Sequence, residues 1–267
     1  DADGNIGLVA GAAGRVSGDR PATSGISGSV SDVTLRGASK VMSMVAGNGD
    51  QLAAMSVRVD RRGHGGFLVP AIDFCFESAG WRPNDVDVIA VDVGPGLFTG
   101  IRAGISTAQA IAAAIGAPMV AISSLTALAV RAATGRRRIW PVVDIRRGQY
   151  ATRPFLPVPG GVAPDGEAEV VTAEGLHHLL DSDAEDVLMV GDTDDFPPGA
   201  LRGLHRVRRG RPRYPSADVL LEIAAFHAQR GQYVRPEDVR PLYMREPDAR
   251  INWTDFREEG AWPGAAE

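Results

Sequence analysis

A glycine-rich segment between a predicted strand and a predicted helix has the residues best suited to bind an anion. The strand covers residues 86–93, and the glycines that follow it are Gly94, Gly96, Gly100 and Gly104. Glycine lets the backbone turn sharply and approach a phosphate closely, and the N-terminus of a helix attracts negative charge. The spacing is not the dinucleotide-binding fingerprint, in which the third glycine comes one residue earlier. A tight turn that packs the helix against its sheet explains the same glycines, with ligand or partner contact as the alternative.

Other kinds of catalytic site are not supported by the sequence. Lys40 is the only lysine, so a phosphate loop that ends in Gly-Lys-Ser or Gly-Lys-Thr is absent. His64 precedes a predicted helix, but a zinc-protease site needs a second histidine four residues later, where this chain has Leu68. His177 and His178 are adjacent and point to different sides of their helix. The sequence therefore predicts no metal ligands and no catalytic residues.

The basic residues are almost all arginines and gather in two clusters. The first cluster comprises Arg131, Arg136, Arg137, Arg138, Arg146 and Arg147, and the second comprises Arg202, Arg206, Arg208, Arg209, Arg211 and Arg213. Lys and Arg number 28 against 33 Asp and Glu, and the net charge of −5 argues against nucleic-acid binding over the whole surface. The net charge does not exclude a local basic patch that binds nucleic acid. The clusters predict either contact with a nucleic-acid backbone or a solvated charged face.

The glycine segment belongs to a βαβ unit. Residues 101–115 are rich in alanine and predict a helix that ends at Gly116, and residues 119–122 predict the next strand. Strand, tight turn, helix and strand in this order are typical of an open α/β sheet. Upstream, apolar runs at residues 41–45 and 52–59 flank an Asn-Gly pair, which predicts a hairpin.

A helix predicted over residues 67–79 has an apolar stripe. Leu68, Ala71, Ile72 and Cys75 recur at spacings of three and four residues. A bundle core and a helix–helix interface would both use such a stripe.

The second half of the chain predicts another α/β unit. Residues 154–166 contain four prolines and three glycines and are expected to form an exposed loop. The predicted elements are a hairpin of residues 139–145 and 149–155, a strand at 167–171, a helix at 172–180, a strand at 186–191 and a last helix at 216–230.

Composition sets the remaining limits. The 267 residues are 44% hydrophobic and 23% charged, which favours two compact lobes. The longest apolar stretch, residues 111–122, is shorter than the about 20 residues of a membrane-spanning helix. The single cysteine, Cys75, excludes an intramolecular disulfide, so a cytoplasmic protein is expected. Residues 1–33 are rich in Gly and Ser and predict a poorly ordered leader.

The glycine segment also resembles a family signature. Residues 93–104, Val-Gly-Pro-Gly-Leu-Phe-Thr-Gly-Ile-Arg-Ala-Gly, are similar to the Gly-Pro-Gly-Ser-Phe-Thr-Gly-Leu-Arg signature of the bacterial TsaB (YeaZ) proteins, a branch of the Gcp-like, M22 glycoprotease-like domains. Further segments resemble landmarks of this family in the same order, at residues 117–125, 143–150, 214–217 and 241–245. Separated matches in the right order are specific.

The resemblance implies a fold and a function. The fold is α/β of the actin and sugar-kinase type (ASKHA), with two lobes built on mixed sheets. The function is that of a non-catalytic subunit of the machinery that forms N6-threonylcarbamoyladenosine on tRNA, next to the anticodon. The subunit dimerises with TsaD, and TsaE is the associated ATPase. No cofactor is expected on this chain alone, because ATP and a metal belong to the partner. Contact with tRNA and a homodimer in the absence of TsaD are further expectations.

The resemblance places the partner-binding face on the first lobe, at the helices of residues 67–79 and 101–115. The residues expected to form it are Leu68, Ala71, Ile72, Cys75, Gly94, Gly96, Thr99, Gly100 and Arg102. The expected organisation is a leader at residues 1–33, a first lobe at 34–128, a second lobe at 129–214, a C-terminal helix and tail that pack back at 215–253, and a disordered tail at 254–267.

Two departures from the family bear on the alternatives. Family members open with a strand ending in Asp-Thr or Glu-Thr, and at residues 35–39 this chain has Leu-Arg-Gly-Ala-Ser, without the carboxylate that would hold a metal or water against phosphate. Leu97 stands where the signature has serine. Both disfavour an autonomous ATPase or phosphotransferase, and the missing histidine pair disfavours an M22-type peptidase.

Overall fold

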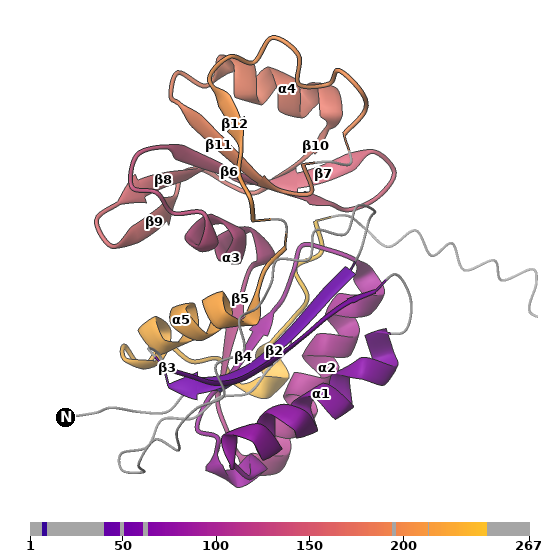
Figure 1. Ribbon diagram of the computed structural model, residues 1–267, viewed down its shortest axis with the longest axis vertical. Coiled ribbons are helices and arrows are strands. Elements are labelled where there is room, and N and C mark those ends of the chain that lie inside the picture. Colours follow the sequence, from indigo (N-terminus) through magenta and orange to yellow (C-terminus); the bar gives the residue numbers. More distant parts are fainter. Residues whose placement is uncertain are drawn as a thin grey trace, which may run out of the picture.

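In the computed structural model, which describes residues 7–9, 40–48, 51–60, 64–193, 196–212 and 214–244, each of two lobes is built around a mixed sheet (Figure 1). The first sheet has the order β3-β2-β1-β4-β5. Strands β1, β4 and β5 are parallel, whereas β2 runs antiparallel to both of its neighbours. The bounds are β1 Gly7–Val9, β2 Lys40–Asn48, β3 Gln51–Asp60, β4 Ile89–Asp92 and β5 Met119–Ile122.

Helices cover both faces of the first sheet. Helices α1 (His64–Ala79) and α2 (Phe98–Ile115) lie on one face, and α5 (Ala217–Ala228) lies on the other (Figure 1). The short β4 is buried because it contributes to both cores: Ile89 and Val91 pack toward α2, and Ala90 packs toward α5. Strands that are covered on both faces have continuous apolar sequences. Short 3₁₀ turns at Pro83–Asp85 (η1) and Pro236–Asp238 (η2) flank this lobe.

The second sheet has the order β10-β7-β6-β11-β12, with β8 paired to β6 and β9 paired to β8. Side chains alternate along its central strand β6. Ile139 and Val143 pack against α3, whereas Trp140 and Val142 pack toward α4. The bounds are α3 Ser124–Arg131, β6 Arg138–Asp144, β7 Gln149–Thr152, β8 Phe155–Val158, β9 Gly161–Pro164, β10 Glu169–Thr172, α4 Ala173–Ser182, β11 Val187–Gly191 and β12 Val207–Arg209.

The local signals of the first lobe are confirmed. The predicted hairpin is β2–β3, and β4, α2 and β5 form the predicted βαβ unit. Helix α2 ends at Gly116, whose φ of 71° lies in the left-handed region. The Ser123 side chain caps α3 by accepting hydrogen bonds from the N–H groups of Leu125 and Thr126. In the part of the chain that is described, no helix is long and apolar enough to cross a membrane.

The predicted exposed loop at residues 154–166 is wrong. These residues form the β8–β9 hairpin, in which Phe155 is paired with Pro164 and also with Ile139 of β6. Only 1% of Phe155 is exposed, so this side chain anchors the hairpin in the core of the second lobe. Prolines are tolerated because the hairpin lies at the margin of the sheet, where a strand has fewer ladder hydrogen bonds to lose.

The expectation of a poorly ordered leader fails at Gly7–Val9. This segment forms β1, inserted between β2 and β4, so the first strand of the sheet comes well before residues 35–39, which lie outside the described residues. In the sequence, Ala10, Gly11 and Ala12 follow β1, and they too lack a carboxylate. A strand this short has no periodicity of its own, and its pairing with distant strands selects it.

Candidate functional site

The glycine segment connects β4 to α2 and is fixed from three sides. The N–H of Val93 donates to the carbonyl of Ile122 at 2.9 Å, and the N–H of Ser124 donates to the carbonyl of Gly94 at 2.8 Å. The N–H of Leu242, near the C-terminal end of the described chain, donates to the carbonyl of Val93 at 2.7 Å. The loop therefore joins three segments that are far apart in the sequence.

Close packing and backbone conformation explain Gly94 but not Gly96. Gly94 has a φ of 98°, and a Cβ at this position would lie 2.8 Å from Cδ1 of Ile101 and 3.4 Å from the carbonyl oxygen of Leu242. A Cβ on Gly96 would lie 3.4 Å from the same Ile101 atom. By contrast, a Cβ on Gly100 would meet nothing within 4 Å. The interpretation as a tight packing turn therefore accounts for Gly94 without a ligand, whereas Gly96 and Gly100 have room for a side chain.

A buried carboxylate lies beneath the loop. Oδ1 of Asp92 accepts hydrogen bonds from the N–H of Gly94 at 2.8 Å and from the hydroxyl of Ser124 at 2.7 Å. Burial raises the pKa of Asp92 to about 6, against the opposing effect of these two hydrogen bonds. Because the chain's own carboxylate occupies the N–H of Gly94, this donor is not free for a phosphate.

Asp92 was not among the residues predicted from the sequence, although a signal was present. Asp92 is the last residue of β4, and polar side chains at the carboxyl ends of parallel strands face the place where ligands and loops meet in α/β folds. Its partner Ser124 lies in the segment of residues 117–125, which the sequence singled out only for its resemblance to a family landmark. Their contact depends on β4 and β5 lying side by side, which tertiary structure provides.

An exposed aromatic and arginine cluster covers the outer side of the loop. The rings of Phe98 and Tyr243 stack with centroids 5.1 Å apart, and the guanidinium of Arg102 lies 3.7 Å from the centroid of Phe98. Nε of Arg102 also donates to the Tyr243 hydroxyl at 2.5 Å. Both rings are 40% exposed, and the neighbouring Thr99 is exposed as well. Of the predicted site residues, Thr99 and Arg102 are thus available to a partner.

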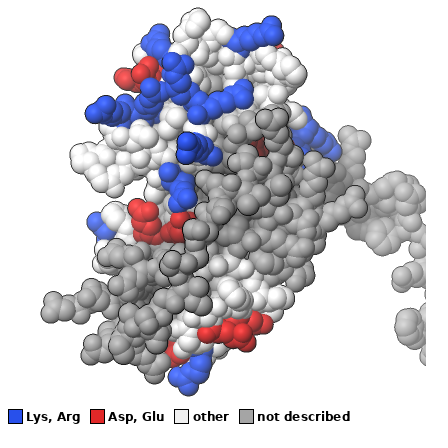
Figure 2. Space-filling model, viewed as in Figure 1, with Lys and Arg blue, Asp and Glu red and all other residues white. Residues whose placement is uncertain are grey.

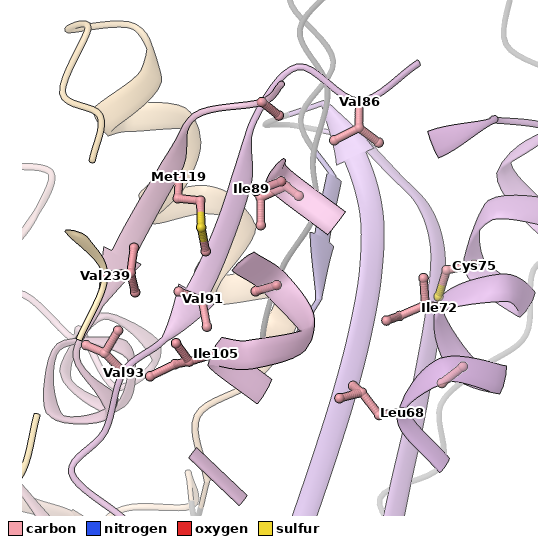
Figure 3. Packing of buried hydrophobic residues seen from close by; sticks show 14 of the residues in the cluster. Leu68, Ile72, Cys75, Val86, Ile89, Val91, Val93, Ile105, Met119 and Val239 are labelled. Carbon is pink, nitrogen blue, oxygen red and sulfur yellow. The ribbon is translucent and has the colours of Figure 1, made fainter. Parts of the chain in front are cut away.

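The predicted partner-binding stripe on α1 is buried in its own lobe, which corrects the sequence analysis. The side chains of Leu68, Ile72 and Cys75 point from α1 toward the first sheet (Figure 3). Exposure of the stripe residues Leu68, Ala71, Ile72 and Cys75 is 2 to 5%. Burial also raises the pKa of the Cys75 thiol to about 11, although a hydrogen bond with the backbone of Ser56 lowers it in part. A stripe at helical spacing marks a buried face, and here the sheet of the same chain buries it.

The exposed apolar residues of α1 lie on either side of its buried stripe. Val69 is 55% exposed and Phe74 is 52% exposed. On the adjacent α2, Ala110, Ala113 and Ala114 are exposed too. The two helices therefore expose apolar residues that are large on α1 and small on α2, and these residues are called the outer face of α1 and α2.

Among the described residues, no group of three or more His, Cys, Asp and Glu side chains is placed to hold a metal ion. His177 bonds through Nδ1 to the carbonyl of Ala200 at 2.8 Å, and the side chain of His64 lies outside what is described.

Two mixed-sheet lobes with a strand–loop–helix unit in the first define a protein of the actin and sugar-kinase fold class, as expected from the sequence. A crystal structure of an uncharacterized Pseudomonas aeruginosa protein with similarity to peptidase YeaZ has a TM-score of 0.66 and is 27% identical, with 77% of this chain and 94% of that chain covered. Residues 58–153 also match the family of TsaD, tRNA N6-adenosine threonylcarbamoyltransferase.

Curated relatives narrow the class to one family. The chain is 30% identical over 218 residues to the tRNA threonylcarbamoyladenosine biosynthesis protein TsaB of Bacillus subtilis (strain 168), which covers 78% of this chain and 91% of the relative. It is 29% identical over 189 residues to the TsaB protein of Escherichia coli (strain K12), which covers 69% of this chain and 81% of the relative. The chain belongs to the TsaB family.

Proposed function

We propose that this chain is a subunit of the machinery that forms N6-threonylcarbamoyladenosine on tRNA, and that it dimerises with TsaD through the outer face of α1 and α2. The observation that carries the proposal is the match to the Bacillus subtilis TsaB protein over 91% of its length. In this proposal the chain contributes to the assembly of the complex and not to the chemical reaction. ATP and metal bind to TsaD, and TsaE joins the complex.

The match to the TsaD family supports the choice of face. It covers residues 58–153, which include both α1 and α2. Two related lobes that present the same pair of helices can pack face to face about an approximate two-fold axis. Exposed Phe74 and Val69 supply apolar area, and the small Ala110 and Ala113 allow a partner helix to approach closely.

The state of the glycine loop supports a role without catalysis. A loop that binds phosphate needs N–H groups free to donate, and the N–H of Gly94 already donates to Asp92. Leu97 precedes α2 and makes no side-chain cap, where the family signature has a serine. These features favour a packing and docking role over phosphate chemistry.

Calorimetric titration of the full chain with TsaD from the same source tests the proposal. We expect saturable binding with one-to-one stoichiometry and no ATP turnover by this chain alone. Phe74→Glu would place a charge in a desolvated interface and should weaken binding at least about 10-fold. Phe226→Glu is the matched control, because Phe226 is 53% exposed and lies on α5, on the opposite face of the sheet.

The outcomes separate the alternatives. If Phe226→Glu weakens binding and Phe74→Glu does not, the docking face is the wrong one. Absence of binding by the unchanged chain at high micromolar concentration would contradict the proposal. ATP turnover by this chain alone would favour the autonomous ATPase. If the chain forms a homodimer in the absence of TsaD through the same face, Phe74→Glu should also make it monomeric in gel filtration.

A further inference from the structure

The second arginine cluster lies in a part of the chain that contains no acidic residue. Between Phe196 and Ser216 there are six arginines and no Asp or Glu, in a protein whose net charge is −5. The structure describes five of these arginines, and all five are exposed: Arg202, Arg206, Arg208, Arg209 and Arg211. Figure 2 shows basic side chains at several places over the lobe that carries β12.

An edge strand holds the centre of this cluster in an extended conformation. Strand β12 is the last strand in the order of the second sheet and pairs with β11 in parallel. Arg208 and Arg209 lie in this strand, and Arg206 lies in the turn directly before it. Gly210 continues the edge, because its N–H donates to the carbonyl of Met189 at 2.7 Å and a Cβ there would lie 2.5 Å from Cγ1 of Val190. The arginine side chains are thus displayed from a fixed backbone.

The structure distinguishes the two arginine clusters by their pairing. In the first cluster, Arg131 pairs with Asp218 at 2.7 Å. Arg138 pairs with Asp183 at 3.4 Å and also contacts Asp165, and Arg146 pairs with Asp144 at 3.3 Å. These guanidinium groups are largely neutralised by carboxylates of the same chain.

Two arginines of the second cluster donate to main-chain carbonyls. Arg206 donates to the carbonyl of Ala184 at 2.5 Å, and Arg208 donates weakly to the carbonyl of His205 at 3.4 Å. Across the described residues, Arg206, Arg208 and Arg211 form no ion pair with Asp or Glu. Like charges held close together repel one another, and a polyanion relieves this repulsion.

We propose that β12 and its flanks form a contact surface for the phosphodiester backbone of RNA. The inference rests on the proposed function, which places the chain in a pathway that acts on tRNA. Arginine suits such a surface because its planar fork donates two hydrogen bonds to phosphate oxygens and keeps its charge at any physiological pH. The alternative role of these arginines is to keep the edge strand from pairing with other sheets. That role requires no affinity for RNA, so a measurement of RNA binding distinguishes the two roles.

Binding of a fluorescently labelled tRNA transcript to the full chain, measured between 50 and 200 mM salt, tests the surface. The variant Arg206→Gln/Arg208→Gln/Arg211→Gln removes three positive charges from it. Each lost phosphate contact costs about 5-fold in affinity at 0.1 M salt, so three contacts cost about 100-fold and reduce the salt slope by about 2. The matching triple substitution to Lys should retain most of the binding, because charge is the main attraction.

The control removes the same charge elsewhere. Arg82→Gln/Arg230→Gln/Arg235→Gln changes three exposed arginines of the first lobe, and we expect RNA affinity within about 3-fold of the unchanged chain. An equal loss in this control would show that only net charge matters and would overturn the proposal. The proposal would also be overturned if the β12 variant bound tRNA as tightly as the unsubstituted chain does. The same holds if the unsubstituted chain bound phosphatidylglycerol vesicles and did not bind tRNA.

Titration with TsaD keeps the two proposals apart. Thermal unfolding first establishes that the β12 variant is folded. We expect it to bind TsaD as the unchanged chain does, because α1 and α2 lie in the other lobe. Loss of tRNA binding with TsaD binding intact supports the RNA surface. If the unchanged chain binds tRNA through β12 and does not bind TsaD, the proposed function fails and the RNA surface stands.

Discussion

Replacing Asp92 with asparagine separates the hydrogen bonds of this buried carboxylate from its charge. The N–H of Gly94 and the hydroxyl of Ser124 both donate to the same oxygen, Oδ1, at 2.8 and 2.7 Å. The amide oxygen of asparagine can accept both hydrogen bonds. Asp92→Asn therefore keeps the contacts that fix the loop and removes the charge that burial penalises.

The magnitude follows from the pKa. Burial raises the pKa of Asp92 from 3.8 to about 6, so the folded protein holds this proton more tightly than the unfolded chain does. Stability from this group is complete below about pH 4 and is lost as the pH rises through the folded pKa. A shift of about 2 pKa units corresponds to about 3 kcal/mol. We expect Asp92→Asn to match the unchanged chain at pH 4 and to exceed its free energy of unfolding by about 3 kcal/mol above pH 6.5.

Urea unfolding of both proteins between pH 4 and pH 8 measures the difference. Groups other than Asp92 titrate alike in the two proteins and cancel. Ser124→Ala is an informative companion, because the loss of one hydrogen bond to the carboxylate should raise the pKa of Asp92 further and enlarge the loss of stability with pH. The reasoning is refuted if the difference between Asp92→Asn and the unchanged chain does not vary with pH, or if the variant is the less stable protein above pH 6.5.

Three further predictions concern the same lobe. Gly94→Ala should lower the free energy of unfolding by about 2 to 4 kcal/mol, and by more than Gly116→Ala does. Both glycines have positive φ, but only at Gly94 would the new Cβ also lie against Ile101. Equal losses of stability in urea unfolding would contradict this clash. Tyr243→Phe removes the hydroxyl that Arg102 contacts and keeps the ring, so we expect a loss below about 1 kcal/mol, and a larger loss would mean that the hydroxyl anchors the C-terminal segment. The Cys75 thiol should resist iodoacetamide at pH 8 until urea unfolds the chain, because it is buried and its pKa is raised to about 11; rapid labelling of the folded protein would contradict this burial.

The elements of the first lobe were predictable because their signals are local. The Asn-Gly pair between two apolar runs predicts the β2–β3 hairpin, and Gly116 marks the end of α2. The serine before α3 predicts its cap. Each of these signals acts over a few residues, so the printed sequence contains all of the information that they need.

The candidate site was predictable only in part. The glycine loop was found from its spacing, but its role depends on Ile101 and Leu242, which pack against Gly94 in the folded chain. The stripe on α1 was found as well, yet periodicity identifies a buried face without saying what buries it. The residues that cover it belong to the same lobe, so the expected partner contact there was wrong for Leu68 and its three neighbours on the stripe.

The sequence by itself determined the family, the βαβ unit, and the positions of both arginine clusters, because composition, caps and motif spacing are written in the order of residues. Only the tertiary structure shows that Gly7–Val9 completes the first sheet and that residues 154–166 pair as a hairpin. It also shows that Arg131, Arg138 and Arg146 pair with carboxylates, whereas Arg206, Arg208 and Arg211 form no ion pair within the described part of the chain. These outcomes depend on which distant segments approach one another. Strand pairing and charge neutralisation are set by distance in space, which separation along the chain does not fix.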